Sequence, residues 1–89
     1  MPNIRSAAKR MRADAKRRLR NLGVKSELKT LTRRFREAVQ AGQVDHARAS
    51  YQLLAQRLDQ AAGRHVLHRN TASRKKARFA LRLAQLSSA

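Results

Sequence analysis

Apolar residues recur at spacings of three and four along the middle of the chain, which is the pattern of amphipathic helices. The first such stripe is Val24, Leu28, Leu31, Phe35 and Ala38. The second stripe is Val44, Ala47, Tyr51, Leu54, Leu58 and Ala61. A third is formed by Ala72, Phe79, Leu83 and Leu86, with Ala80 beside it. The sequence shows no alternating pattern of the kind that strands produce, so helix is the only element it predicts.

Glycine and capping residues set the predicted ends of these helices. Gly42 suits the position just after a helix, and Gly63 ends the second helix in the same way, while Asp45 suits that helix's opening turn. Asn70 is a good N-cap for the third helix. The predicted helices span residues 5–41, 44–62 and 70–86. Their connections are short, so neighbours should pack antiparallel, and we predict an all-α, three-helix bundle.

The first predicted helix changes its apolar face at Gly23. Before that residue the apolar positions are Ile4, Ala8, Met11, Ala15, Leu19 and Leu22. At about 100° per residue, this stripe lies nearly opposite the one that follows Gly23. A row of cations continues the later apolar face instead: Arg5, Lys9, Arg12, Lys16 and Arg20, with Arg10 and Arg17 next to it. One helix therefore combines a core-facing half with a cationic half.

Helix lengths support this division. The first predicted helix would be about 55 Å long and the second only about 28 Å, at 1.5 Å per residue. The second helix can therefore cover only half of the first, and we expect the basic half to project beyond the bundle.

The charge balance points to a polyanionic partner. The chain of 89 residues has 22 Lys and Arg against 5 Asp and Glu, a formal net charge of +17, which is more than solubility requires. Residues 1–36 hold 13 basic and 2 acidic side chains, residues 37–63 hold 2 and 3, and residues 64–89 hold 7 and none. The length allows one small domain, residues 1–89, whose extended part needs a partner for stability.

The second basic cluster belongs to the start of the third helix. In an up-down-up bundle this segment lies beside the middle of the first helix, and so the two cationic clusters should approach each other. Its members are Arg64, His65, His68, Arg69, Arg74, Lys75, Lys76 and Arg78. His65 and His68 lack a third ligand nearby, so we expect no metal; they should contact backbone, cap the third helix or meet phosphate. Ser6, Ser26, Thr30 and Ser73 suit either phosphate contacts or ordinary capping.

Nucleic acid fits this charge better than other polyanions. A membrane-active basic helix would set aromatic or Leu side chains opposite its charges, and that face here has no aromatic residue. The three aromatics, Phe35, Tyr51 and Phe79, all lie on apolar stripes, which favours core packing over base stacking. Sixteen of the cations are Arg, whose forked donors suit phosphate and folded RNA. A nucleoid-type basic DNA-binding protein is the alternative, although no DNA-binding motif is present.

Catalysis, cofactors and membrane insertion find no support in the sequence. The acidic residues are scattered singly, without a segment that would pair them as acid and base. The chain has no Cys and no apolar run that approaches the roughly 20 residues of a membrane span. We therefore expect a non-enzymatic protein without cofactor or metal that stays soluble inside the cell.

Three stretches resemble, in order and spacing, the motifs of the bacterial small-subunit ribosomal protein S-twenty family. They are IRSAAKR (4–10), KRRLRNLGVKSELKT (16–30) and HRNTASRKKARF (68–79). The chain departs from the family pattern at Ala8 and Thr71, where members commonly carry Lys. The resemblance implies a monomeric structural constituent of the small subunit that binds 16S ribosomal RNA during assembly. It also implies that the first helix lies among RNA helices of the 5′ domain and near the long penultimate stem, in a cytoplasmic or plastid ribosome.

The motifs and the basic clusters together give a set of expected RNA-contacting residues. From the first helix these are Arg5, Lys9, Arg10, Arg12, Lys16, Arg17, Arg18, Arg20, Asn21, Lys25, Ser26 and Lys29. From the third helix and the turn before it they are Arg64, His68, Arg69, Asn70, Arg74, Lys75, Lys76 and Arg78. Without RNA the aligned cations repel one another, so residues 5–22 should be poorly helical in the free protein.

Overall fold

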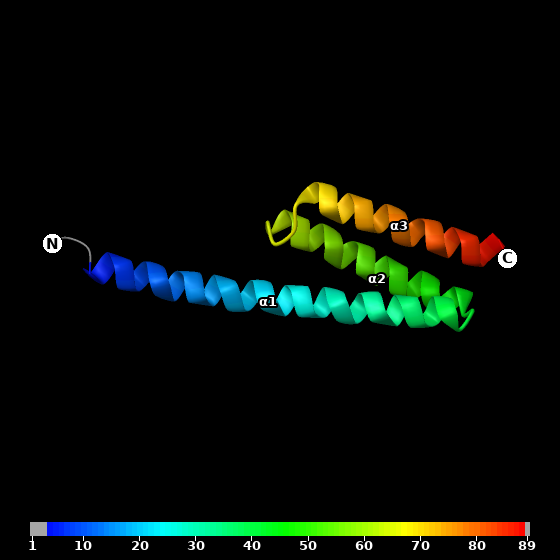
Figure 1. Cartoon of the computed structure of the whole chain (residues 1–89), viewed down its shortest axis with the longest axis horizontal. Helices are drawn as coiled ribbons and strands as arrows, with labels where there is room; N and C mark the ends of the chain where they lie inside the picture. Colours follow the sequence, from blue (N-terminus) through cyan, green and yellow to red (C-terminus); the bar gives the residue numbers. More distant parts are fainter. Residues whose placement is uncertain (1–3, 89) are drawn as a thin grey trace.

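The computed structural model describes residues 4–88 and contains three helices, α1 (Ile4–Gln40), α2 (Val44–Gly63) and α3 (Arg69–Ser88). The described residues include no strand, so the predicted all-α class is confirmed, and each helix begins and ends within two residues of its predicted bounds. Figure 1 shows α2 antiparallel to both α1 and α3 over the C-terminal half of α1. The Cα atoms extend over 68 × 21 × 13 Å, because α1 runs far beyond its neighbours.

The core lies where all three helices overlap. Its buried residues are Leu28, Leu31, Phe35, Ala38, Ala47, Leu54, Leu58, Ala61, Ala72 and Phe79. The ring of Phe35 lies at its centre, with ring centroids 5.4 Å from Phe79 and 6.2 Å from the half-buried Tyr51. All three predicted stripes therefore face this core, and the aromatic residues are packed inside it as expected.

The first turn follows the prediction made for Gly42. This glycine adopts φ +71°, the left-handed conformation that residues with a Cβ rarely take. Its neighbour Gln43 donates its N–H to the carbonyl of Ala38 at 3.1 Å, which satisfies one of the free carbonyls at the end of α1.

The second turn corrects two predictions. Gly63 is the last residue of α2, and the left-handed residue is instead His65, with φ 59°. Asn70 does not cap α3, because the helix already begins at Arg69 and the Asn70 N–H donates to Nδ1 of His68 at 3.1 Å. The carbonyl of His68 accepts the N–H of Ala72, so His68 is the capping residue, one of the roles expected for it. An imidazole nitrogen can accept a helical N–H as a hydroxyl or amide oxygen does.

The N-terminal half of α1 projects alone from the bundle (Figure 1). Every residue from 4 to 20 is exposed, and the apolar side chains are no exception: Ile4 is 79% exposed and Leu19 70%. The helix continues through Gly23 without a break. Within residues 4–88, each helix is too short or too polar to cross a bilayer.

Candidate nucleic-acid interface

Five of the eight cations of the projecting half form one surface, the outer row, made of Arg5, Lys9, Arg12, Lys16 and Arg20, whereas Arg18 lies beside Leu19 and Leu22 on another side of the helix. At 1.5 Å per residue the row extends over about 22 Å. All five residues are exposed, and Asp14 is the single acidic residue between positions 4 and 22. Arg10 and Arg17 flank the row on the same exposed half. Its positive field is therefore almost uncompensated within the chain.

The outer row meets the second basic cluster in a notch of 420 Å³ at the middle of α1. Arg17, Arg20 and Asn21 line it from α1, and Arg64 and His65 line it from the turn after α2. The turn before α3 therefore lies beside the middle of α1, as the up-down-up arrangement predicts. Three guanidinium groups around one small hollow suit phosphate oxygens, which accept several N–H donors at once.

The remaining cations of the second cluster do not gather in this notch. Lys76 pairs with Asp59 of α2, with 2.7 Å between Nζ and Oδ1, and this hydrogen bond raises the pKa of Lys76. Arg74 and Arg78 are exposed on α3. His68 and Arg69 line a separate hollow of 440 Å³ at the start of that helix, and Asn70 is exposed in its first turn. The charge of Lys76 thus serves the contact between α2 and α3.

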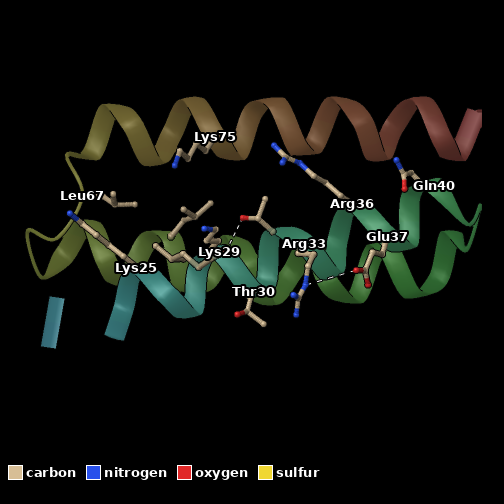
Figure 2. Close-up of a pocket in the computed structure, with 12 residues that line it drawn as sticks. Lys25, Lys29, Thr30, Arg33, Arg36, Glu37, Gln40, Leu67 and Lys75 are labelled. Carbon is tan, nitrogen blue, oxygen red and sulfur yellow. Dashed lines mark hydrogen bonds and ion pairs between the residues drawn. The ribbon is translucent and has the colours of Figure 1, made fainter. Parts of the chain in front are cut away.

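A larger groove, of 830 Å³, separates α1 from α3 (Figure 2). It exists because α3 packs mainly on α2 and touches α1 at few positions. Four cations line it from α1 and one from α3: Lys25, Lys29, Arg33, Arg36 and Lys75. We call the four on α1 the groove row.

Sequence reasoning missed two members of the groove row. Lys25, Lys29 and Lys75 were expected to contact RNA, but Arg33 and Arg36 were not among the expected residues. The signal was present, since the groove row recurs at spacings of four, four and three, the same rhythm that identified the outer row.

Comparison with known proteins identifies the family. The family model described as ribosomal protein S20 matches residues 2–84. The chain belongs to the ribosomal protein S20 family. It is 48% identical to the small ribosomal subunit protein bS20 of Thermobifida fusca over 86 residues, which cover 97% of this chain and 94% of that protein.

Other relatives of the same description agree. The chain is 48% identical to the bS20 protein of Mycolicibacterium smegmatis, covering 97% of this chain and 100% of that one. It is 46% identical to that of Pelotomaculum thermopropionicum, covering 98% and 99%. The resemblance seen in the three sequence motifs is thus confirmed, and the family is one of ribosomal structural proteins rather than enzymes.

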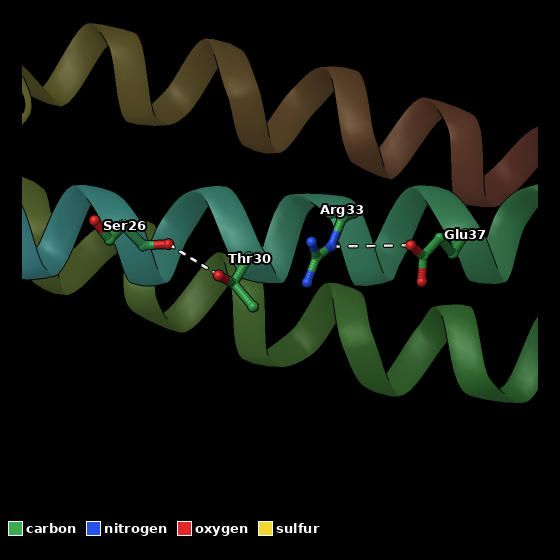
Figure 3. Close-up of polar contacts among 4 residues, drawn as sticks. All are labelled: Ser26, Thr30, Arg33 and Glu37. Atoms are coloured by element: carbon green, nitrogen blue, oxygen red, sulfur yellow. Dashed lines mark hydrogen bonds and ion pairs between the residues drawn. The ribbon is translucent and has the colours of Figure 1, made fainter.

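In this S20 family member, Thr30 beside the groove row and Arg33 within it have structural contacts (Figure 3). The Thr30 hydroxyl donates to the backbone carbonyl of Ser26 at 3.1 Å. Because that bond uses the only hydroxyl proton of Thr30, its side chain has no donor left for a phosphate oxygen. Arg33 lies 3.9 Å from Glu37, and both side chains are exposed, so this ion pair is weak. Ser26, by contrast, is exposed on α1.

Glu27, the single acid within the basic stretch 16–30, points to α2. Its Oε1 lies 3.0 Å from Nε of Arg57, which joins α1 to α2 at the point where the bundle begins. The acid therefore pairs with a cation of the middle helix and not with the cations of its own stretch, residues 16–30. Among residues 4–88, no cluster of three or more His, Asp or Glu could hold a metal ion.

Proposed function

We propose that this protein is a structural constituent of the small ribosomal subunit that binds 16S ribosomal RNA directly and stabilises its folding during assembly. The relatives are named as small ribosomal subunit proteins, which supports the location. The observation that carries the direct contact is the notch, where Arg17 and Arg20 of α1 meet Arg64 of the turn before α3. It brings the inner end of the outer row, Arg20, together with Arg64 of the second cluster.

The mechanism is charge neutralisation by a rigid rod. RNA helices repel one another through their phosphates, and a helix about 10 Å wide can lie between two backbones with Arg and Lys reaching both. The forked Arg donors bond two phosphate oxygens at once, which fixes orientation as well as supplying attraction. Contacts of this kind read the shape of folded RNA and not a base sequence. The partner is therefore a folded segment of 16S ribosomal RNA, contacted by a protein monomer in a cytoplasmic or plastid ribosome.

A salt titration with folded 16S ribosomal RNA tests this proposal. If six to ten phosphates are contacted, affinity should fall by about 10³ to 10⁵ between 50 and 200 mM salt. A flat titration would contradict the proposal. Competition with duplex DNA at equal salt distinguishes the proposed function from that of a nucleoid-type DNA-binding protein. A nucleoid-type protein would bind both polymers equally tightly, whereas we expect a clear preference for the folded RNA.

Matched variants locate the contact on the outer row. Replacing Arg12 and Lys16 with Gln removes two charges from the projecting half and should reduce affinity about tenfold or more. The control replaces Arg34 and Arg48, two exposed cations that line neither the notch nor the groove, and removes the same charge. Equal losses in both variants would show that only net charge matters.

A further inference from the structure

The turn between α2 and α3 holds a hollow that lies outside the outer row and beside the notch. It has a volume of 440 Å³ and is lined by Ala62, His65, Leu67, His68 and Arg69. His65 also lines the notch, so the two depressions share one wall. Figure 1 shows this turn at the end of the bundle from which α1 projects. A ribonucleotide whose phosphate lies in the notch therefore has the hollow next to it.

The lining of the hollow differs in chemistry from that of the notch. Arg69 is its single permanent cation, whereas three guanidinium groups surround the notch. Ala62 and Leu67 give it half-buried apolar walls, and the two histidines are exposed. A phosphate prefers several charged donors, but an unpaired base stacks on flat imidazole and guanidinium groups. The hollow therefore suits a base better than a phosphate.

The ring of His68 is oriented by the protein itself. Its Nδ1 accepts the backbone N–H of Asn70 at 3.1 Å. The neutral ring therefore carries its proton on Nε2, where it can be donated to a ligand. The guanidinium of Arg69 has donors and no acceptor. These two side chains fit a base edge that carries acceptors, such as N7 and O6 of guanine.

The backbone of His65 gives independent support. Its φ of 59° lies in the left-handed region, which glycine adopts without strain and a residue with a Cβ does not. The turn thus carries an imidazole at a position where glycine would fit the backbone better. Backbone strain of this kind is concentrated at functional sites, so the ring of His65 has a use beyond the turn.

We propose that this hollow binds one unpaired nucleobase of 16S ribosomal RNA, with the base stacked on His65 and its acceptor edge bonded to His68 and Arg69. The inference rests on the proposed function and deepens it, because the contacts proposed there read the shape of RNA whereas this site reads a base. Paired bases are stacked inside their helix, so the nucleotide belongs to a loop, a bulge or an end of the folded RNA.

Removing the ring of His65 separates base recognition from charge neutralisation. At pH 8, where imidazole is ordinarily neutral, His65→Gly removes no charge. Its affinity for folded 16S ribosomal RNA should fall about fivefold or more, as for one lost base stack, with the slope of log affinity against log salt unchanged. Because glycine relieves the backbone, the melting temperature of the free variant should be unchanged or higher. If it is lower, His65→Asn repeats the test, since Asn also tolerates this region.

Two further variants are the controls. His46→Ala removes an exposed imidazole at the opposite end of α2 and should leave the affinity unchanged. The outer-row variant, with Arg12 and Lys16 replaced by Gln, should lower both the affinity and the salt slope. If His65→Gly binds like His46→Ala while the outer-row variant loses affinity, the hollow inference is overturned and the proposed function stands. A reduced salt slope for His65→Gly would place a phosphate in the hollow and also overturn the inference. If the outer-row variant keeps its affinity, the proposed function itself fails.

The absence of Cys allows the bound nucleotide to be located, because one introduced thiol is the only attachment site for a photoreactive group. In assembled small subunits, a group on Ala62→Cys should crosslink to one unpaired nucleotide that a group on Ala49→Cys, on the exposed side of α2, does not reach. An abasic substitution at that nucleotide should weaken binding of the original chain but weaken His65→Gly no further. The inference is overturned if the crosslink falls on paired nucleotides, on a neighbouring protein or nowhere, or if the two losses add.

Discussion

Residues 4–22 and 24–40 belong to one unbroken helix but are stabilised in different ways. The inner half buries Leu28, Leu31, Phe35 and Ala38 against α2 and α3. The outer half buries no residue, and Asn21 is its single half-buried one. Helix formation alone is marginal in water for segments of this length, so tertiary burial must stabilise the inner half. The outer half has helix-forming residues but gains no such burial, and its cations repel one another.

The difference shows what the charge contributes. In the inner half of α1, the cations lie on the faces that do not pack against the core. In the outer half, the outer row lies next to the continuation of the face that packs against the core farther along the helix. Under the proposed function, the partner of that surface is RNA, and a helix with a protein end and an RNA end would need both partners before its whole length is stable.

Truncating the central ring should produce the largest effect on stability. We expect Phe35→Ala to cost about 3–5 kcal/mol of unfolding free energy, because the 0% exposed ring leaves a cavity between α1, α2 and α3. The matched change in the outer half, Leu19→Ala, should alter it by less than about 0.5 kcal/mol. Urea unfolding of the free protein measures both, with Phe35→Leu as a milder variant should Phe35→Ala be unfolded at 25 °C. Similar costs for Leu19 and Phe35 would show that the two halves do not differ.

Amide hydrogen exchange should reveal the same contrast along the backbone. In the free protein, amides of residues 8–22 should exchange about 10²- to 10³-fold faster than those of residues 28–38, because the outer half can open without disturbing the core. Bound to 16S ribosomal RNA, the outer half should become protected. Strong protection of residues 8–22 without RNA would refute this account and the sequence-based expectation that they are then poorly helical.

The glycine between the two halves offers a smaller but more local test. A Cβ added at Gly23 meets no atom within 4 Å, so Gly23→Ala should stabilise the helix by about 0.5–1 kcal/mol. It should also extend exchange protection from the inner half outwards. The control is Gly42→Ala, which should destabilise the protein by about 1 kcal/mol or more because its φ is +71°. Destabilisation by Gly23→Ala would show that the junction needs a flexible residue.

The smallest effect concerns two adjacent lysines of α3. Lys76→Gln should slightly lower the melting temperature of the free protein, since it removes the ion pair with Asp59, whereas Lys75→Gln should leave it unchanged. Lys75→Gln should lower RNA affinity more than Lys76→Gln does, because Lys75 faces the groove. The pKa of Lys76 is raised by its bond to Asp59, so the pair stabilises the fold below the ordinary lysine pKa of about 10.4 and is lost as pH rises through the raised value. Equal melting temperatures for the two variants at pH 7 would contradict this.

Sequence periodicity was sufficient for the helices and for the exposure of the cationic half of α1. The stripe from Val24 to Ala38 predicted the inner face of α1, and helix lengths predicted that the basic half projects, because both depend on local repeat geometry. The notch was foreseen in outline, since short connections leave few ways to arrange three helices. The sequence signal for the groove row existed but was not used, since Arg33 and Arg36 were not among the expected RNA-contacting residues.

Turn details depended on contacts that short motifs do not specify. His65 takes the left-handed position expected near Gly63, and His68 caps α3 in place of Asn70. Glycine and Asn are the commonest residues at such sites, but the position of the turn is decided by where α2 and α3 must pack. Packing likewise decided that Lys76 points to Asp59 and the adjacent Lys75 to the groove.

The amino-acid sequence alone determined the three helices, the length of α1 and the exposure of its cationic half, because these follow from residue spacing and from charge that cannot be buried without a partner. Only the tertiary structure decided that α3 rests on α2 and stands away from α1. That choice depends on how side chains such as Phe35 and Phe79 fill one small core, and it opens the groove that gives α1 its second basic surface.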